Sequence, residues 1–129
     1  MDDDPTYSVE QARALIPMIR GTLLQLAVER QRTDDAHDAL YHRLAGDPPS
    51  GGAEKAQLES AMGAMRAGIR DLLDHLEALG IIVRDLDEGL VDIPTLRGGE
   101  RAWLCWRLSD PELEYWHTTS EGFSARQPL

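Results

Sequence analysis

The feature that most constrains the fold is a row of apolar residues in the middle of the chain, spaced alternately four and three positions apart. The row consists of Leu58, Met62, Met65, Ile69, Leu72, Leu76 and Leu79. Such a heptad repeat gives one side of a helix an unbroken apolar seam for a partner helix. The pattern predicts a helix from about Ala53 to Leu79, ended by Gly80, because glycine suits the left-handed conformation found just after helices.

A second helix is predicted upstream. Ser8-Val9-Glu10-Gln11 matches a capping box, in which the Ser and Gln side chains each bond the other residue's backbone amide. An apolar row follows, and it continues in the same register into a polar stretch. The apolar part is Ala12, Leu15, Ile16, Ile19, Leu23 and Leu26, and the continuation is Arg30, Thr33, His37, Leu40 and Leu44. A Pro/Gly-rich break at 46–52 then predicts an antiparallel hairpin over 8–79.

Beyond Gly80 the periodicity changes to short segments rich in β-branched and aromatic residues, separated by turn signals. The segments are 81–86, 89–93, 101–108 and 113–117. We expect an α+β fold in which a long antiparallel two-helix hairpin is followed by a small antiparallel β-meander. The chain is predicted to be a single domain over 1–129, with the hairpin at 8–79, the β element at 81–117 and an ordered or partly ordered tail at 118–129.

The formal net charge of −10 is spread along all 129 residues. No segment concentrates positive charge, so neither a nucleic acid nor an anionic membrane surface is an expected partner. No apolar run approaches the roughly 20 residues that a membrane span requires. Cys105 has no second cysteine to pair with, which favours a reducing compartment. We therefore expect a cytoplasmic protein.

Two helices cover only one side of each other, so a partner chain is the simplest way to bury the rest of their apolar surface. We expect a homo-oligomer, in its smallest form a dimer, that forms through the hairpin. The interface residues predicted on the second helix are Leu58, Met62, Met65, Ile69, Leu72 and Leu76.

A polar band on the first helix raises the possibility of a metal site. Asp34 and His37 are three positions apart and share a helix face, a spacing that holds metals in helical bundles. The facing helix brings no ligand to this point, since His37 is expected opposite Met62. Asp34 and His37, together with Cys105 and His117, are therefore weak metal candidates, and the band is better interpreted as a solvated or pairing-specific polar layer of Arg30, Thr33 and His37.

A second cluster lies near the C-terminus, where Arg107, Glu114, His117 and Arg126 are candidate ligand-binding residues. The strand register decides their placement. An even number of turn residues after Leu108 puts Leu113, Tyr115 and His117 on the Leu104 face. An odd number puts Cys105 and His117 together, which suits a metal site or a reactive thiol. The even register buries more apolar surface and is favoured.

A string of motifs in the C-terminal third resembles an uncharacterised prokaryotic family, a domain of unknown function with series number 2203. The motifs are Gly89-Leu90-Val91-Asp92-Ile93-Pro94, Leu104-Cys105-Trp106-Arg107, Glu112, Trp116-His117, Gly122-Phe123 and Arg126-Gln127-Pro128. The resemblance implies a shared fold, and the family brings no established activity or catalytic residue.

No catalytic set converges in the sequence, and no cofactor is expected. There is no phosphate-binding glycine motif, nucleophile elbow or paired-cysteine zinc spacing. The leading hypothesis is a protein of unknown biochemical function that acts as a non-enzymatic, oligomerising interaction module. The alternative is a small-molecule site for an anionic ligand, or a catalytic site, on the β element. A metal-binding protein is a weaker alternative.

Overall fold

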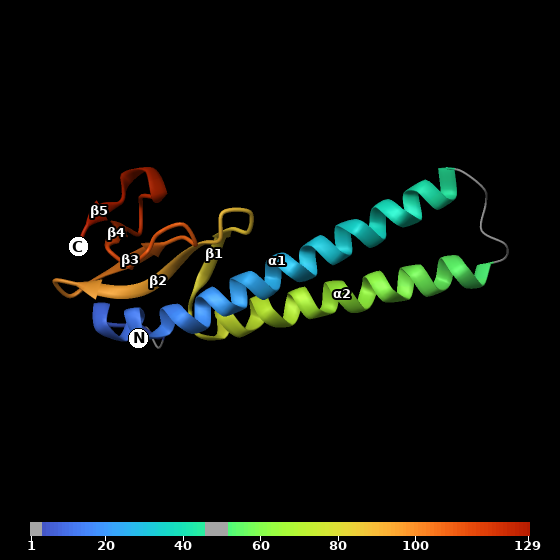
Figure 1. The fold of residues 1–129 in the computed structure, drawn as a ribbon. Coiled ribbons are helices and arrows are strands. Elements are labelled where there is room, and N and C mark those ends of the chain that lie inside the picture. The colour runs from blue at the N-terminus through green and yellow to red at the C-terminus, as the bar shows by residue number, and fades with distance from the viewer. Residues whose placement is uncertain (1–3, 46–51) are drawn as a thin grey trace.

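The computed structural model describes residues 4–45 and 52–129 and begins with the predicted helical hairpin (Figure 1). Helix α1 spans Val9–Ala45 and helix α2 spans Gly52–Ala78. The capping box is confirmed: the Ser8 amide donates to Gln11 Oε1 at 2.9 Å, and the Gln11 amide donates to Ser8 Oγ at 3.1 Å. The predicted break at 46–52 lies almost entirely outside the described residues.

The heptad seam of α2 faces α1 of the same chain. Met62 and Leu76 are buried, and the other five seam residues are half-buried. Gly80 adopts a φ of +80°, and the Ile81 amide bonds back to the Leu76 carbonyl at 3.0 Å. This confirms the predicted end of the helix and turns the chain into the sheet.

The row of α1 that faces α2 differs from the predicted polar layer. Arg30 and His37 are exposed, whereas Glu29, Thr33, Ala36 and Leu40 are half-buried. After Leu26 the inward row takes a second three-residue step and continues at positions 29, 33, 36 and 40. Arg30 and His37 then point to solvent, where their polar groups avoid the cost of desolvation. Thr33 alone of the predicted layer lies in the seam.

Five strands form an antiparallel sheet in the order β1-β2-β3-β4-β5, which confirms the predicted meander. The strands are β1 Ile82–Asp85, β2 Leu90–Arg97, β3 Glu100–Trp106, β4 Tyr115–Thr118 and β5 Gln127–Pro128. Gly98 and Gly99, with φ of +59° and +81°, join β2 to β3, as a two-residue hairpin turn requires. The tail also holds a 3-10 turn, η1 Phe123–Ala125, and supplies β5.

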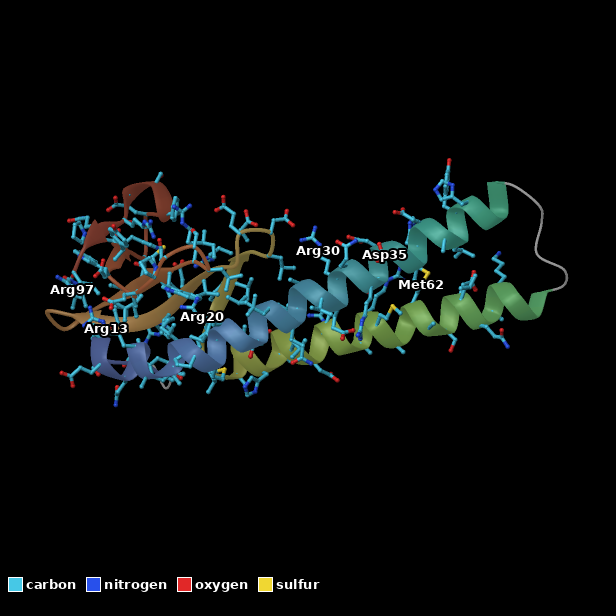
Figure 2. The ribbon with its side chains drawn as sticks, viewed as in Figure 1. Arg13, Arg20, Arg30, Asp35, Met62 and Arg97 are labelled. Atoms are coloured by element: carbon cyan, nitrogen blue, oxygen red, sulfur yellow. The ribbon has the colours of Figure 1, made fainter. Side chains whose placement is uncertain are left out.

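The first half of α1 packs across one face of the sheet, which we call the inner face (Figure 1). The buried core consists of Ala12, Ile16, Ile19, Leu23 and Leu26 from α1, Leu76 from α2, Ile81 just before β1, and Val91, Ile93, Leu104, Trp106 and Leu113 from the β element. Arg13 and Arg20 reach from α1 to the sheet side (Figure 2): Arg13 Nε donates to the Leu113 carbonyl at 3.1 Å, and the Arg20 guanidinium lies 5.1 Å from the Trp106 ring centre.

The two helices continue together past the sheet as a two-helix arm, which we define as residues 28–45 of α1 and 52–68 of α2 (Figure 1). Across the described parts of the chain, neither helix has the length and apolar character needed to cross a membrane.

Candidate functional site

The opposite, outer face of the sheet gathers polar side chains from three neighbouring strands. Asp92 on β2 pairs directly with Cys105 on β3, and Trp103 on β3 pairs with His117 on β4. Directly paired residues in an antiparallel sheet point to the same face, and alternate residues share it. Asp92, Cys105 and His117 therefore lie together. They are on the face that is covered by the C-terminal segment, residues 119–129 (Figure 1).

The favoured even register is wrong. Leu104 pairs with Trp116, and Cys105 pairs with Tyr115, so Trp116 takes the inner face and His117 the outer one. The reason lies in the loop at 107–114, which brings Leu113 into the core without any strand alternation. Strand β4 then contributes Trp116 to the inner face, so apolar burial no longer requires His117 to point inward.

Both ring nitrogens of His117 face oxygen acceptors. Nε2 lies 2.9 Å from Asp92 Oδ1, and Nδ1 lies 2.8 Å from the Thr118 carbonyl oxygen. His117 and Asp92 are 2% and 3% exposed. A neutral imidazole has one N–H and satisfies only one of these contacts. With Nε2–H donating to Asp92, Nδ1 faces the Thr118 carbonyl with a lone pair, and with Nδ1–H donating to Thr118, Nε2 faces the Asp92 carboxylate with one.

Arg84 holds the other oxygen of the same carboxylate. Its Nε donates to Asp92 Oδ2 at 2.9 Å, and its guanidinium lies 5.3 Å from the Trp103 ring centre. Because both carboxylate oxygens have partners, Asp92 is held in one orientation. Arg84 remains about half-exposed at the surface.

Cys105 completes the cluster. One ligand-type atom from each of Asp92, Cys105 and His117 lies within 4.8 Å of the others, and all three residues are buried. Burial raises the pKa of the Cys105 thiol to about 11, the negative charge of Asp92 adds to this, and the guanidinium of Arg126, which hydrogen-bonds the thiol, opposes it. The free cysteine is therefore a neutral thiol at pH 7.

A pocket of about 350 Å³ lies beside this cluster and touches it at Asp92. Asp92 and Arg84 form part of its wall, so the buried carboxylate is in contact with the pocket. The remaining lining residues are Leu90, Thr119, Ser120, Glu121, Gly122 and Phe123. The wall thus combines a cation, two carboxylates, two hydroxyl groups and apolar surface.

Two of the predicted ligand residues meet at a different acceptor. Arg126 Nη1 donates to Asp110 Oδ2 at 2.8 Å, and the Arg107 amide donates to the same oxygen at 3.2 Å. The guanidinium of Arg126 also lies 4.0 Å from the Tyr115 ring centre and 4.3 Å from that of Phe123. These contacts hold the C-terminal segment against the outer face.

The other predicted residues lie apart from this arrangement. Glu114 is exposed, and its backbone carbonyl accepts from the Leu129 amide at 2.8 Å. His37 and Asp34 are exposed on α1. Within the described ranges, the group of three or more metal-ligating side chains is Asp92, Cys105 and His117, so the structure joins the two C-terminal metal candidates and leaves the two helical ones outside.

Sequence reasoning missed Asp92 and Arg84. A signal for Asp92 was present, because it is a carboxylate between Val91 and Ile93 in the middle of an apolar strand. A buried carboxylate in such a strand requires a charged or hydrogen-bonding partner. Its partners come from neighbouring strands and become identifiable only once the register is known.

The comparisons with known proteins agree with the motifs in the C-terminal third. Neither a search of curated proteins nor a search of solved structures found a match. A family model described as an uncharacterized conserved protein matches residues 6–129, which is nearly the whole chain. The chain therefore belongs to the uncharacterized conserved protein family DUF2203.

Proposed function

We propose that this protein is a self-associating interaction module in which two copies pack their helical arms together as a four-helix bundle. The observation that carries the proposal is the shortage of buried side chains in the arm. Among its described side chains Met62 is the one that is fully buried, while Leu40, Leu58 and Met65 are half-buried. A second hairpin laid across these half-buried rows would bury them further, as in four-helix bundles.

The chemistry of the arm supports this geometry. Its half-buried rows keep the heptad spacing, which is the spacing that knobs-into-holes packing uses. An isolated two-helix arm gains little from hydrophobic burial, because apolar stabilisation scales with the area removed from water. Pairing with a second copy supplies that area without any new element of structure.

The change Met65→Glu tests this proposal. A carboxylate can reach water from a half-buried position in a single hairpin, whereas it would be desolvated in the centre of a bundle. We expect wild-type protein to sediment at twice the 14.4 kDa chain mass across the micromolar range, and Met65→Glu to sediment at the chain mass with unchanged far-UV circular dichroism. Sedimentation equilibrium measures both.

Leu24→Glu is the matched control, because Leu24 lies on α1 and is already 53% exposed. This variant should remain dimeric. A wild-type monomer at all concentrations contradicts self-association, and a Leu24→Glu monomer beside a Met65→Glu dimer contradicts the assigned face.

A reducing, cytoplasmic setting fits this proposal. Cys105 is a free, buried thiol with no second cysteine in the chain. An intrachain disulfide, of the kind that stabilises small secreted domains, therefore does not contribute to the stability of this protein.

A second candidate function is the binding of a small anionic molecule in the outer-face pocket. The observation in its favour is Arg84, a half-exposed guanidinium in the wall of that pocket, since guanidinium pairs with carboxylate or phosphate groups. We expect phosphate or citrate to raise the melting temperature of wild-type protein and to leave that of Arg84→Gln unchanged. Equal shifts in both proteins, or no shift in either, contradict this site.

A further inference from the structure

We infer that Asp92, Cys105 and His117 form a mononuclear binding site for a divalent transition-metal ion of the zinc type, with an open coordination position facing the outer-face pocket. The inference deepens the second candidate function and is independent of the association of the helical arms. Its basis is the convergence of three different ligand types from three adjacent strands on one point.

The donor set suits this class of metal. Thiolate, imidazole and carboxylate are the three side-chain groups that bind zinc in proteins, and three protein ligands with a free fourth position are typical of sites that bind an exchangeable ligand. Ligand atoms around a tetrahedral zinc ion lie about 3.2–3.8 Å apart. The three ligand-type atoms here lie within 4.8 Å of one another, so small side-chain rotations bring them to that spacing.

The surrounding contacts orient the ligands as metal sites require. His117 keeps Nε2 toward the cluster, and Nδ1 lies 2.8 Å from the Thr118 carbonyl oxygen, to which it donates in the tautomer that binds a metal through Nε2. Asp92 keeps Oδ1 toward the cluster because Oδ2 accepts from Arg84 Nε. Metal-binding histidines and carboxylates in proteins are oriented by hydrogen bonds of this kind.

The Nε2–Oδ1 distance of 2.9 Å is that of an N–H···O hydrogen bond when the imidazole carries its proton on Nε2. A metal ion would take the place of that proton, with the imidazole proton moved to Nδ1, where it donates to the Thr118 carbonyl. Binding converts the Cys105 thiol to a thiolate and releases its proton to solvent. No oxidation or reduction is involved.

With the Cys105 thiol protonated, the carboxylates of Asp92 and Asp110 balance the guanidinium groups of Arg84 and Arg126. A dication that displaces the thiol proton adds one net positive charge to this group. An anionic ligand entering the pocket would find both the open metal position and the Arg84 guanidinium, which explains why an anion and a metal suit the same face.

Untagged protein treated with a chelator and then titrated with Zn²⁺ or Co²⁺ tests this site. We expect one ion per chain, and for Co²⁺ a thiolate charge-transfer band together with visible bands of tetrahedral intensity. Cys105→Ser should abolish the charge-transfer band, and His117→Gln should weaken affinity by at least about 100-fold, since losing even an outer partner costs 10–100-fold.

His37→Gln is the matched control, because it removes an exposed histidine on α1, and it should bind as wild-type protein does. Circular dichroism checks that each variant is folded, and the cobalt spectrum of wild-type protein reports thiolate coordination without any variant. Wild-type protein that binds no ion, or that binds one without a thiolate band, overturns the inference. If wild-type protein binds no ion while phosphate or citrate still stabilises chelator-treated protein, the anion site stands while the metal site fails.

Discussion

Trp106→Ala is expected to lower the free energy of unfolding by about 4 kcal/mol, because truncating a buried tryptophan removes its transfer free energy and leaves a cavity. Trp106 is fully buried between the inner face of the sheet and α1. Its Nε1 donates to the Asp110 carbonyl at 3.2 Å, and Arg20 covers its ring. Urea unfolding followed by far-UV circular dichroism measures the loss without depending on tryptophan fluorescence.

Trp103→Ala provides the comparison within the same strand. Trp103 lies on the outer face and is half-buried, so its truncation should cost about 1–2 kcal/mol, in proportion to the smaller area it removes from water. Equal losses for the two variants would contradict the assignment of the two faces.

Much of the architecture was predictable because its signals are local. The capping box at Ser8 and Gln11 satisfies its own amides, and Gly80 ends the helix that the heptad row begins. In the same way, Gly98 and Gly99 provide the two positive φ angles that a tight hairpin needs. Each of these features depends on residues a few positions apart, so a single sequence contains the required information.

The candidate site was predicted only in part, since it depends on pairings between distant segments. Asp92 and His117 are 25 positions apart, and they meet because a loop, and not a strand, brings Leu113 into the core. A shift of one residue in β4 would turn His117 to the other face. The expected register of β4 placed more apolar residues on the inner face. It is wrong because Trp116 fills that face in the observed register.

The contacts of Asp110 lead to a pH-dependent prediction. Burial alone would raise the pKa of Asp110, but the hydrogen bonds from Arg126 and from the Arg107 amide, with the positive charges of both arginines, lower it below its ordinary 3.8. We expect Asp110→Ala to cost about 3 kcal/mol at pH 7, because it leaves the largely buried Arg126 guanidinium without its partner. Hydrogen exchange should also show faster exchange at the amides of Gln127 and Leu129, as the C-terminal segment loses its anchor.

The sign of the pH dependence follows from the lowered pKa. A carboxyl group with a lower pKa in the folded state stabilises the fold above its unfolded pKa and loses this contribution as the pH falls through the folded value. The stability difference between wild-type protein and Asp110→Ala should therefore be constant above about pH 5 and shrink progressively below pH 3.8. Asp87→Ala is the control, since Asp87 is 77% exposed in its pair with Arg30, and exposed pairs contribute about 0–1 kcal/mol. A difference that is the same at pH 3 and pH 7, or a loss for Asp110→Ala no larger than that for Asp87→Ala, would show that the Arg126 contact does not hold the C-terminal segment in place.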